Sequence, residues 1–121
     1  MNFQNLESLL LRHFGFESFL DHQKEVVEDI VSGNDLCVVM PTGAGKSLCY
    51  QLPAMIKDSY TLIISPLIAL MADQVAALQK RNIPAAFINS SISFQEQLAA
   101  VRAAEAGNLK LLYIAPERLQ N

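Results

Sequence analysis

The chain has 121 residues, of which 51% are hydrophobic and 17% charged, which is enough for one globular domain. Its net charge of −3 at pH 7 argues against a protein that binds nucleic acid mainly through positive charge. The acidity is concentrated at the start, because residues 1–35 carry seven acids and two bases, whereas residues 36–121 carry five acids and seven bases. The later part is therefore better suited to binding phosphate.

Cysteine content and hydropathy indicate the compartment. Cys37 and Cys49 are too few for a disulfide framework, and their apolar neighbours predict two reduced, buried thiols. No apolar run approaches the roughly 20 residues that cross a bilayer. Residues 1–16 lack the basic and apolar regions of a signal peptide. We therefore expect a cytoplasmic protein without a membrane partner.

Two helices are predicted first. Apolar residues at helical spacing run from Leu6 to Phe14, and Gly15 is a stop signal. Asp21 can cap a second helix, which Gly33 ends. The buried stripe of this second helix consists of four aliphatic residues: Val26, Val27, Ile30 and Val31.

Strands and helices then alternate. Leu36–Met40, with β-branched residues at its centre, predicts a strand buried on both faces. Pro41–Gly45 is a loop, and a helix runs from Lys46 until Pro53. Further strands are predicted at Tyr60–Ser65, Ala85–Ile88 and Leu109–Ala115, and further helices at Leu67–Lys80 and Phe94–Ala106. This order predicts an α/β fold of parallel βαβ units with right-handed crossovers.

The strongest signal for function is the segment Met40-Pro41-Thr42-Gly43-Ala44-Gly45-Lys46-Ser47, which follows a predicted strand and opens a helix. Gly45, Lys46 and Ser47 fit the P-loop pattern, although Met40 stands where the first glycine belongs. Glycines let backbone amides turn toward phosphate oxygens, and the helix start adds further amides and a positive dipole end. Lys46 is expected to reach the β- and γ-phosphates of ATP, and the Ser47 hydroxyl to coordinate Mg²⁺. The alternative is an ordinary glycine-rich turn, which has no need of Lys-Ser at the helix start.

Residues 40–54, Met-Pro-Thr-Gly-Ala-Gly-Lys-Ser-Leu-Cys-Tyr-Gln-Leu-Pro-Ala, closely resemble motif I of the RecQ family of superfamily 2 DNA helicases. Three more segments resemble motifs of that family in the same order: Phe14-Gly15-Phe16 with Phe19 and Gln23 (motif 0, residues 14–23), residues 64–74 (motif Ia) and residues 113–119 (motif Ib). The resemblance covers nearly the whole chain. It implies a RecA-like P-loop parallel sheet flanked by helices, and ATP-driven 3′–5′ unwinding of DNA in recombination and repair.

Motif 0 implies recognition of adenine. A glutamine amide can accept a hydrogen bond from adenine N6 and donate one to N7, a pairing that guanine reverses, and Gln23 suits this role. The resemblance places Phe16 against the face of the base. Considered without the resemblance, Phe16 and its neighbouring phenylalanines are core aromatics and Gln23 is a surface residue. The chain departs from the family at Leu20, where an arginine usually flanks the other face of the adenine.

Motifs Ia and Ib imply contacts with the DNA backbone. Ser65 and Pro66 follow a predicted strand, at the carboxyl end where open parallel sheets bind ligands. The resemblance adds Arg118, and Ser90 and Ser91 are further candidates for the same track, which would hold phosphates without reading sequence. Considered alone, Ser-Pro and Ala-Pro are simply loop starts.

The chain contains no Asp-Glu-Ala-His segment, which in this family holds Mg²⁺ and orients the attacking water, and no second motor domain. We therefore expect a truncated, incomplete first helicase domain whose partners are DNA and the remainder of the helicase chain, and expect the 121 residues alone to be inactive. In RecA-like sheets the neighbour of the P-loop strand comes from later sequence, so Leu36–Met40 would lack its pairing partner. The alternatives are a non-catalytic nucleotide- or DNA-binding piece and a P-loop kinase. His13 and His22 are expected to face solvent, and the sequence has no cluster of metal ligands.

Overall fold

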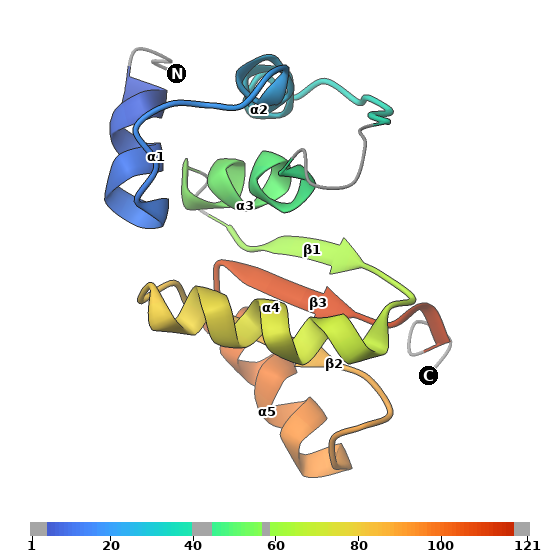
Figure 1. Cartoon of the computed structure of the whole chain (residues 1–121). Helices are drawn as coiled ribbons and strands as arrows, with labels where there is room; N and C mark the ends of the chain where they lie inside the picture. Colours follow the sequence, from blue (N-terminus) through green and yellow to red (C-terminus); the bar gives the residue numbers. More distant parts are fainter. Residues whose placement is uncertain (1–4, 40–44, 57–58, 118–121) are drawn as a thin grey trace. The chain divides into compact units, whose positions relative to one another are not determined.

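The chain folds into two compact units, Met1–Lys57 and Asp58–Asn121. The computed structural model describes residues 5–39, 45–56 and 59–117. Figure 1 shows the elements in chain order, with helices in the first unit and a parallel sheet with two helices in the second. The predicted fold class, an α/β domain with a parallel sheet, is therefore confirmed.

The described part of the first unit contains three helices: α1 (Leu6–Phe14), α2 (Gln23–Val31) and α3 (Lys46–Ile56). α1 ends where predicted, because Gly15 adopts a left-handed φ of 79° and donates its N–H to the Leu11 carbonyl. The Nζ of Lys24 forms an ion pair with the Glu7 carboxylate. This pair connects the first turn of α2 to the first turn of α1.

The predicted cap of α2 is wrong. The helix begins at Gln23, and its N-cap position is held by His22, which is in the left-handed region at φ 70° and makes no side-chain cap bond. Asp21 lies one residue too early, and an N-cap side chain normally needs an extended backbone at the cap position itself. At the other end, Gly33 adopts φ 87° just after the helix, as predicted for a stop signal.

The predicted strand at Leu36–Met40 does not form within the described residues. Residues 34–39 have no strand pairing, and Val38 and Val39 are 42% and 93% exposed. Met40 lies outside the described residues. A strand exists only through hydrogen bonds to a neighbour, and no strand of the described sheet pairs with this segment. Cys37 is exposed for the same reason, contrary to the prediction that it is buried.

α3 is longer than predicted, because it passes through Pro53 and ends at Ile56. A proline removes one helical hydrogen bond and usually ends or kinks a helix. Here Pro53 is fully buried, together with Leu52 and Ala54. The packing of this turn therefore outweighs the lost backbone bond.

The second unit contains a parallel sheet in the order β1-β3-β2. Its strands are β1 (Thr61–Ile64), β2 (Ala85–Ile88) and β3 (Leu111–Ile114), all within the predicted ranges. The last residues of the strands are in register, since Ile114 pairs with Ile64 on one side and with Ile88 on the other. The loops that follow the three strands therefore begin side by side at the carboxyl edge of the sheet.

Two helices connect these strands: α4 (Ile68–Lys80) and α5 (Phe94–Glu105). The crossover from β1 to β2 and the return from β2 to β3 run in opposite directions, so right-handed connections put α4 and α5 on opposite faces. α5 packs Ala100 and Ala104 against Ile88 and Leu112. The buried face of α4 consists of Met71, Val75 and Leu78.

Candidate functional site

The P-loop enters the described structure at Gly45. This glycine has a left-handed φ of 75°, and α3 begins at the next residue, Lys46. Lys46 is exposed and Ser47 is half-buried, both in the first turn of the helix. Gly-Lys-Ser therefore lies where a loop meets a helix N-terminus, the arrangement that a phosphate site needs. Met40, Pro41, Thr42, Gly43 and Ala44 lie outside the described residues, so their phosphate contacts stay predictions.

Gln23 joins motif 0 to the P-loop. Its side chain is only 3% exposed, so it is not the surface residue of the alternative reading. The amide oxygen accepts the Leu20 N–H at 2.7 Å, and the amide nitrogen donates to the Gly45 carbonyl at 3.1 Å. These two bonds hold the loop before α2 against the start of α3, across 22 positions of sequence.

The left-handed backbone of Gly45 and the space around it both favour glycine. A Cβ built on this residue would lie 2.1 Å from the amide nitrogen of Gln23, which is far inside van der Waals contact. The Cys49 thiol also donates to the Gly45 carbonyl, over 3.8 Å. Cys49 is buried as predicted, packs against Val26 of α2, and has its thiol pKa raised by burial. The carbonyl of the P-loop glycine therefore accepts hydrogen bonds from both α2 and α3.

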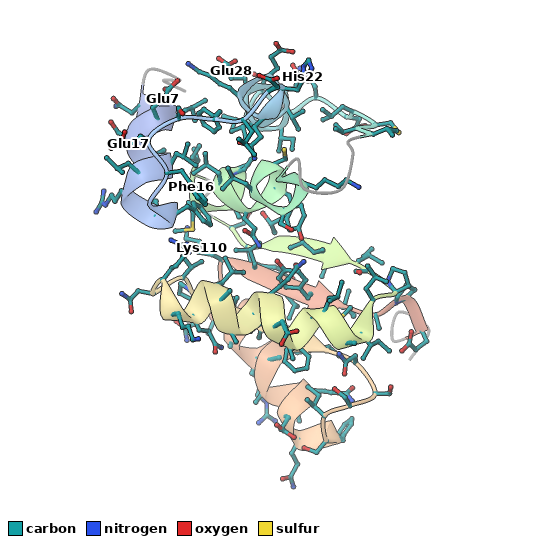
Figure 2. All side chains as sticks on the ribbon, viewed as in Figure 1. Glu7, Phe16, Glu17, His22, Glu28 and Lys110 are labelled. Atoms are coloured by element: carbon teal, nitrogen blue, oxygen red, sulfur yellow. The ribbon has the colours of Figure 1, made fainter. Side chains whose placement is uncertain are left out.

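Phe16 and Leu20 are exposed residues of motif 0. They are 53% and 55% exposed, on the loop between α1 and α2, where Figure 2 labels Phe16. The Cδ1 of Leu20 would be 3.4 Å from a Cβ at Gly45, so Leu20 lies close to the P-loop. Phe14, by contrast, is buried in α1. The core-aromatic alternative therefore holds for Phe14 and not for Phe16.

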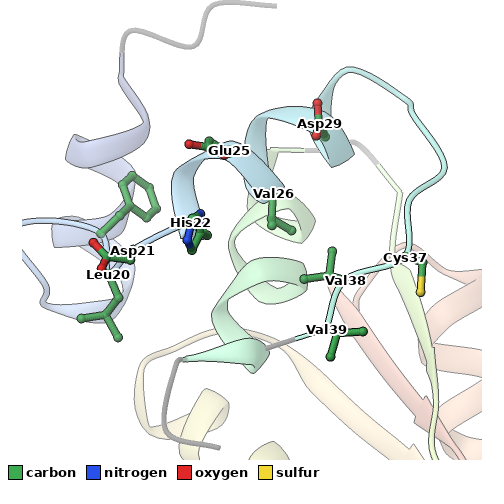
Figure 3. Close-up of a pocket in the computed structure, with 10 residues that line it drawn as sticks. Leu20, Asp21, His22, Glu25, Val26, Asp29, Cys37, Val38 and Val39 are labelled. Carbon is green, nitrogen blue, oxygen red and sulfur yellow. The ribbon is translucent and has the colours of Figure 1, made fainter. Parts of the chain in front are cut away.

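Two hollows lie beside α2 in the described part of the first unit, and they differ in the charged residues that line them. The larger, of about 960 Å³, lies between α2 and residues 37–39 (Figure 3). Among the described residues it is lined by Asp21, Glu25 and Asp29, whose carboxylates repel phosphate, and not by Gly45, Lys46 or Ser47. The smaller, of about 500 Å³, is lined by Lys46, Cys49 and Tyr50 of α3 and by one acidic residue, Asp35. With one lysine and one carboxylate against three carboxylates, the smaller hollow repels an anion less than the larger one does.

The predicted DNA-contacting serines lie on two loops of the carboxyl edge. Ser65 donates its N–H to the Ile114 carbonyl at 3.1 Å, and its Oγ accepts the Leu67 N–H at 3.2 Å. Pro66 and Ser90 are exposed. Ser65 directly follows β1, and Asn89, the residue before Ser90, directly follows β2. Because both strands pair with β3, these two positions lie on either side of it. Arg118 lies outside the described residues.

Asn89 is a residue that the sequence analysis missed. It is 0% exposed, in a serine-rich turn, and it bonds to Ser91 and Met71. An asparagine directly after a buried strand is the sequence signal that could have indicated it, since asparagine side chains often close turns on their own backbone.

The two histidines differ from one another. His22 is exposed as predicted, whereas His13 is half-buried in α1. Burial lowers the pKa of His13, and the positive charge of Arg12 lowers it further. No three His, Cys, Asp or Glu side chains converge on a metal site in the part of the chain that the structure describes.

Comparison with known proteins identifies the family. A model of the DEAD/DEAH box helicase family matches residues 20–121. The chain belongs to the DEAD/DEAH box helicase family. The match excludes the P-loop kinase alternative. It begins after Phe16, so this residue lies outside the part that the DEAD/DEAH box model covers.

The predicted resemblance to RecQ helicases is also confirmed. The chain is 49% identical to the ATP-dependent DNA helicase RecQ of Haemophilus influenzae, over 93% of this chain and 18% of that protein. It is 44% identical to the RecQ of Synechocystis, over 96% of this chain and 24% of that protein. It is 47% identical to the RecQ of Bacillus subtilis, over 93% of this chain and 19% of that protein. This DEAD/DEAH box chain therefore spans about a fifth of the length of the curated relatives.

A solved structure supports the fold of this DEAD/DEAH box chain. It resembles the crystal structure of a hypothetical ATP-dependent RNA helicase from Sulfolobus tokodaii with a TM-score of 0.74, over 99% of this chain and 35% of the other. The two sequences are 22% identical, so this likeness concerns the fold alone. As to membranes, none of the helices in the described residues has the length and apolar character that a transmembrane span requires.

Proposed function

We propose that this chain supplies the ATP-binding site and part of the DNA-contacting face of an ATP-dependent 3′–5′ DNA helicase of RecQ type, which acts in recombination and repair. The observation that carries the proposal is the junction at Gly45, where the P-loop, the start of α3 and Gln23 of motif 0 meet. The names of the relatives support the choice of ATP and DNA. A DNA substrate also fits the cytoplasmic location predicted from the sequence.

In this proposal Lys46 and Ser47 bind the phosphates of ATP. The Lys46 ammonium would neutralise the β- and γ-phosphates beside the N-terminus of α3, and the Ser47 hydroxyl would hold Mg²⁺. When bound, Mg²⁺ supplies positive charge to the phosphate oxygens. The acidic residues and the arginine that hydrolysis requires would come from the remainder of the helicase chain, which is the proposed protein partner.

Two roles are possible for Gln23 in this proposal, and measurements of nucleotide binding can distinguish them. Its amide nitrogen bonds to the Gly45 carbonyl, so it can hold the P-loop in shape. The same amide can instead bind the adenine edge, as the resemblance to motif 0 implies, with Phe16 against the face of the base. In the second role ATP binding exchanges the bond to Gly45 for bonds to adenine.

The carboxyl edge of the sheet is the proposed DNA track. Neighbouring strands lie about 4.8 Å apart, so the loops after β1 and β2, which flank β3, are about 10 Å apart. Ser65 and Ser90, with Pro66 and Ser91 beside them on these loops and Arg118 after β3, would line the path of successive phosphates and bind them through hydroxyls, main-chain amides and one guanidinium. Such contacts position a DNA strand without selecting its sequence.

The test of the ATP site is a calorimetric titration of the chain with Mg-ATP. Lys46→Ala should weaken ATP binding roughly 10- to 100-fold, because hydrogen bonds to charged groups contribute about 1.5–3 kcal/mol. The matched control is Lys80→Ala, which removes an exposed lysine at the end of α4. In the helicase that contains this chain, Lys46→Ala should also abolish ATP hydrolysis. Equal ATP affinity in both variants would remove the assignment.

The role of Gln23 is tested by titrating ATP and GTP into Gln23→Ala. If Gln23 reads adenine, the unmutated chain prefers ATP and the variant loses that preference. If Gln23 only holds Gly45, the variant loses affinity for both nucleotides by the same factor. Equal binding of ATP and GTP by the unmutated chain would contradict adenine recognition.

A further inference from the structure

We propose that Asn89 is the positioning residue of the DNA track, which holds the turn Asn89–Ser93 in a fixed shape so that Ser90 and its backbone meet a phosphate. The inference rests on the proposed DNA-contacting function of the carboxyl edge. Asn89 is buried and would itself touch no DNA, but it would fix the shape of one of the loops that do.

The hydrogen bonds of the buried Asn89 amide are the first observation. The side-chain oxygen accepts both the N–H of Ser91, at 2.8 Å, and the Ser91 hydroxyl. The side-chain nitrogen donates to the Met71 sulfur at 3.4 Å. A primary amide that is 0% exposed is costly to bury unless it is bonded, and here both ends are bonded. The amide thus connects the turn to the interior of the unit.

A second clamp comes from α5. The side-chain nitrogen of Gln97 donates to the Asn89 carbonyl at 3.1 Å and to the Ile92 carbonyl at 3.2 Å. At the end of the turn, Ser93 and Glu96 form a capping box that starts α5. The turn is therefore held at both of its ends before any ligand arrives, so little ordering of the loop remains to oppose binding.

The location of Asn89 relates this clamp to the DNA track. Asn89 follows β2 directly, and Met71 belongs to the first turn of α4, which begins three residues after Ser65. The Asn89–Met71 bond therefore joins the loop after β2 to α4, the helix that follows the loop carrying Ser65 and Pro66. The turn Asn89–Ser93 contains no charged residue, and the carboxylate of Glu96, in the first turn of α5, accepts the Ser93 N–H at 3.1 Å. The contact of this turn with a phosphate would thus use neutral donors.

The experiment measures binding of a fluorescent single-stranded oligonucleotide of twelve thymidines to the 121-residue chain, by anisotropy at several salt concentrations. Asn89→Ala should weaken binding about three- to tenfold, the effect of one lost hydrogen bond. Neutral contacts release no counterions, so the dependence of affinity on salt should not change. The matched control is Asn108→Ala, an exposed asparagine in the turn before β3, at the opposite edge of the sheet.

A double variant separates positioning from general stability. If Asn89 acts through the turn, Asn89→Ala combined with Ser90→Ala should bind no more weakly than the weaker single variant, because both changes remove the same contact. Additive losses, with a lower melting temperature, would make Asn89 a folding residue and overturn the inference. If Asn89→Ala does not fold, Met71→Leu replaces it in the same comparison, since this substitution removes the sulfur acceptor and keeps the apolar volume.

The two proposals fail in different ways. If the unmutated chain does not bind the oligonucleotide, the DNA track is wrong and the role of Asn89 falls with it. If the unmutated chain binds and Asn89→Ala behaves like Asn108→Ala, the track stands and the role of Asn89 is wrong.

Discussion

At the scale of single residues, Gly45 and Gly33 provide a matched pair. Both have a left-handed backbone, with φ of 75° and 87°, but a Cβ at Gly33 would meet nothing within 4 Å, whereas one at Gly45 would strike the Gln23 amide. Alanine at either position should cost about 1 kcal/mol of folding stability through backbone strain. Gly45→Ala should cost more and also weaken ATP binding, because Gln23 must move. Urea unfolding and ATP titration of both variants would show this, and equal effects would contradict it.

Leu20 is the residue-scale position at which the chain departs from its family. Its side chain is exposed, and its N–H is held by Gln23 whatever the side chain is. Leu20→Arg should therefore leave the fold intact and tighten ATP binding about threefold, because a guanidinium stacks on a base better than an isobutyl group does. Leu11→Arg, at an exposed leucine of α1, is the control for added charge. ATP affinity that rises equally in both variants would point to charge alone.

At the scale of elements, the ion pair of Glu7 and Lys24 connects α1 to α2. The hydrogen bond and charge of Lys24 lower the pKa of the Glu7 carboxyl below its usual 4.5. A lowered carboxyl pKa stabilises the fold above the unfolded pKa, and the contribution disappears as pH falls through the folded pKa. Glu7→Gln should therefore lower the melting temperature slightly at pH 7 and not at all at strongly acidic pH.

The effect should be small because both side chains are 43% exposed. The control is Glu17→Gln, an exposed glutamate of the loop after α1, labelled with Glu7 in Figure 2. A difference between the two variants that persists unchanged below pH 3 would show that the ion pair is not its cause.

At the scale of the whole molecule, the exposed segment before the P-loop should make the chain self-associate. Val38 and Val39 are exposed apolar residues with no strand pairing in the described part of the chain, and such segments pair with other chains. Val39→Lys should increase the monomer fraction on a sizing column, since a charged side chain opposes the pairing of this segment with a strand of another chain. Val101→Lys, at an exposed valine of α5, should not. If both variants elute like the unmutated chain, another surface is responsible.

Catalysis is also a property of the whole molecule. We expect the 121 residues alone to release no phosphate from ATP, with or without DNA, because they contain no Asp-Glu-Ala-His segment to hold Mg²⁺ and orient water. Binding by the P-loop does not by itself stabilise the transition state more than the ground state. Turnover that depends on Lys46, from a monodisperse monomer, would show that the catalytic unit is smaller than proposed.

Local signals in the sequence determined most of the second unit and the family. The ranges of β1, β2 and β3 and their parallel arrangement follow from apolar runs separated by amphipathic segments, because these patterns depend on neighbours in the chain. Gly15 ends α1 for a local reason as well, since only a left-handed residue closes that turn easily. Gly45-Lys46-Ser47 at a helix start is likewise readable from spacing alone.

The tertiary structure decided what depends on distant partners. Leu36–Met40 has the composition of a strand, but a strand needs hydrogen bonds to another strand, and composition cannot supply one. Gln23 looks like a surface residue until α2 packs on α3 and its amide reaches Gly45. The bond of Asn89 to Met71 forms only because α4 packs against β2. In each case the deciding contact joins residues far apart in sequence, and patterns within one segment do not contain that information.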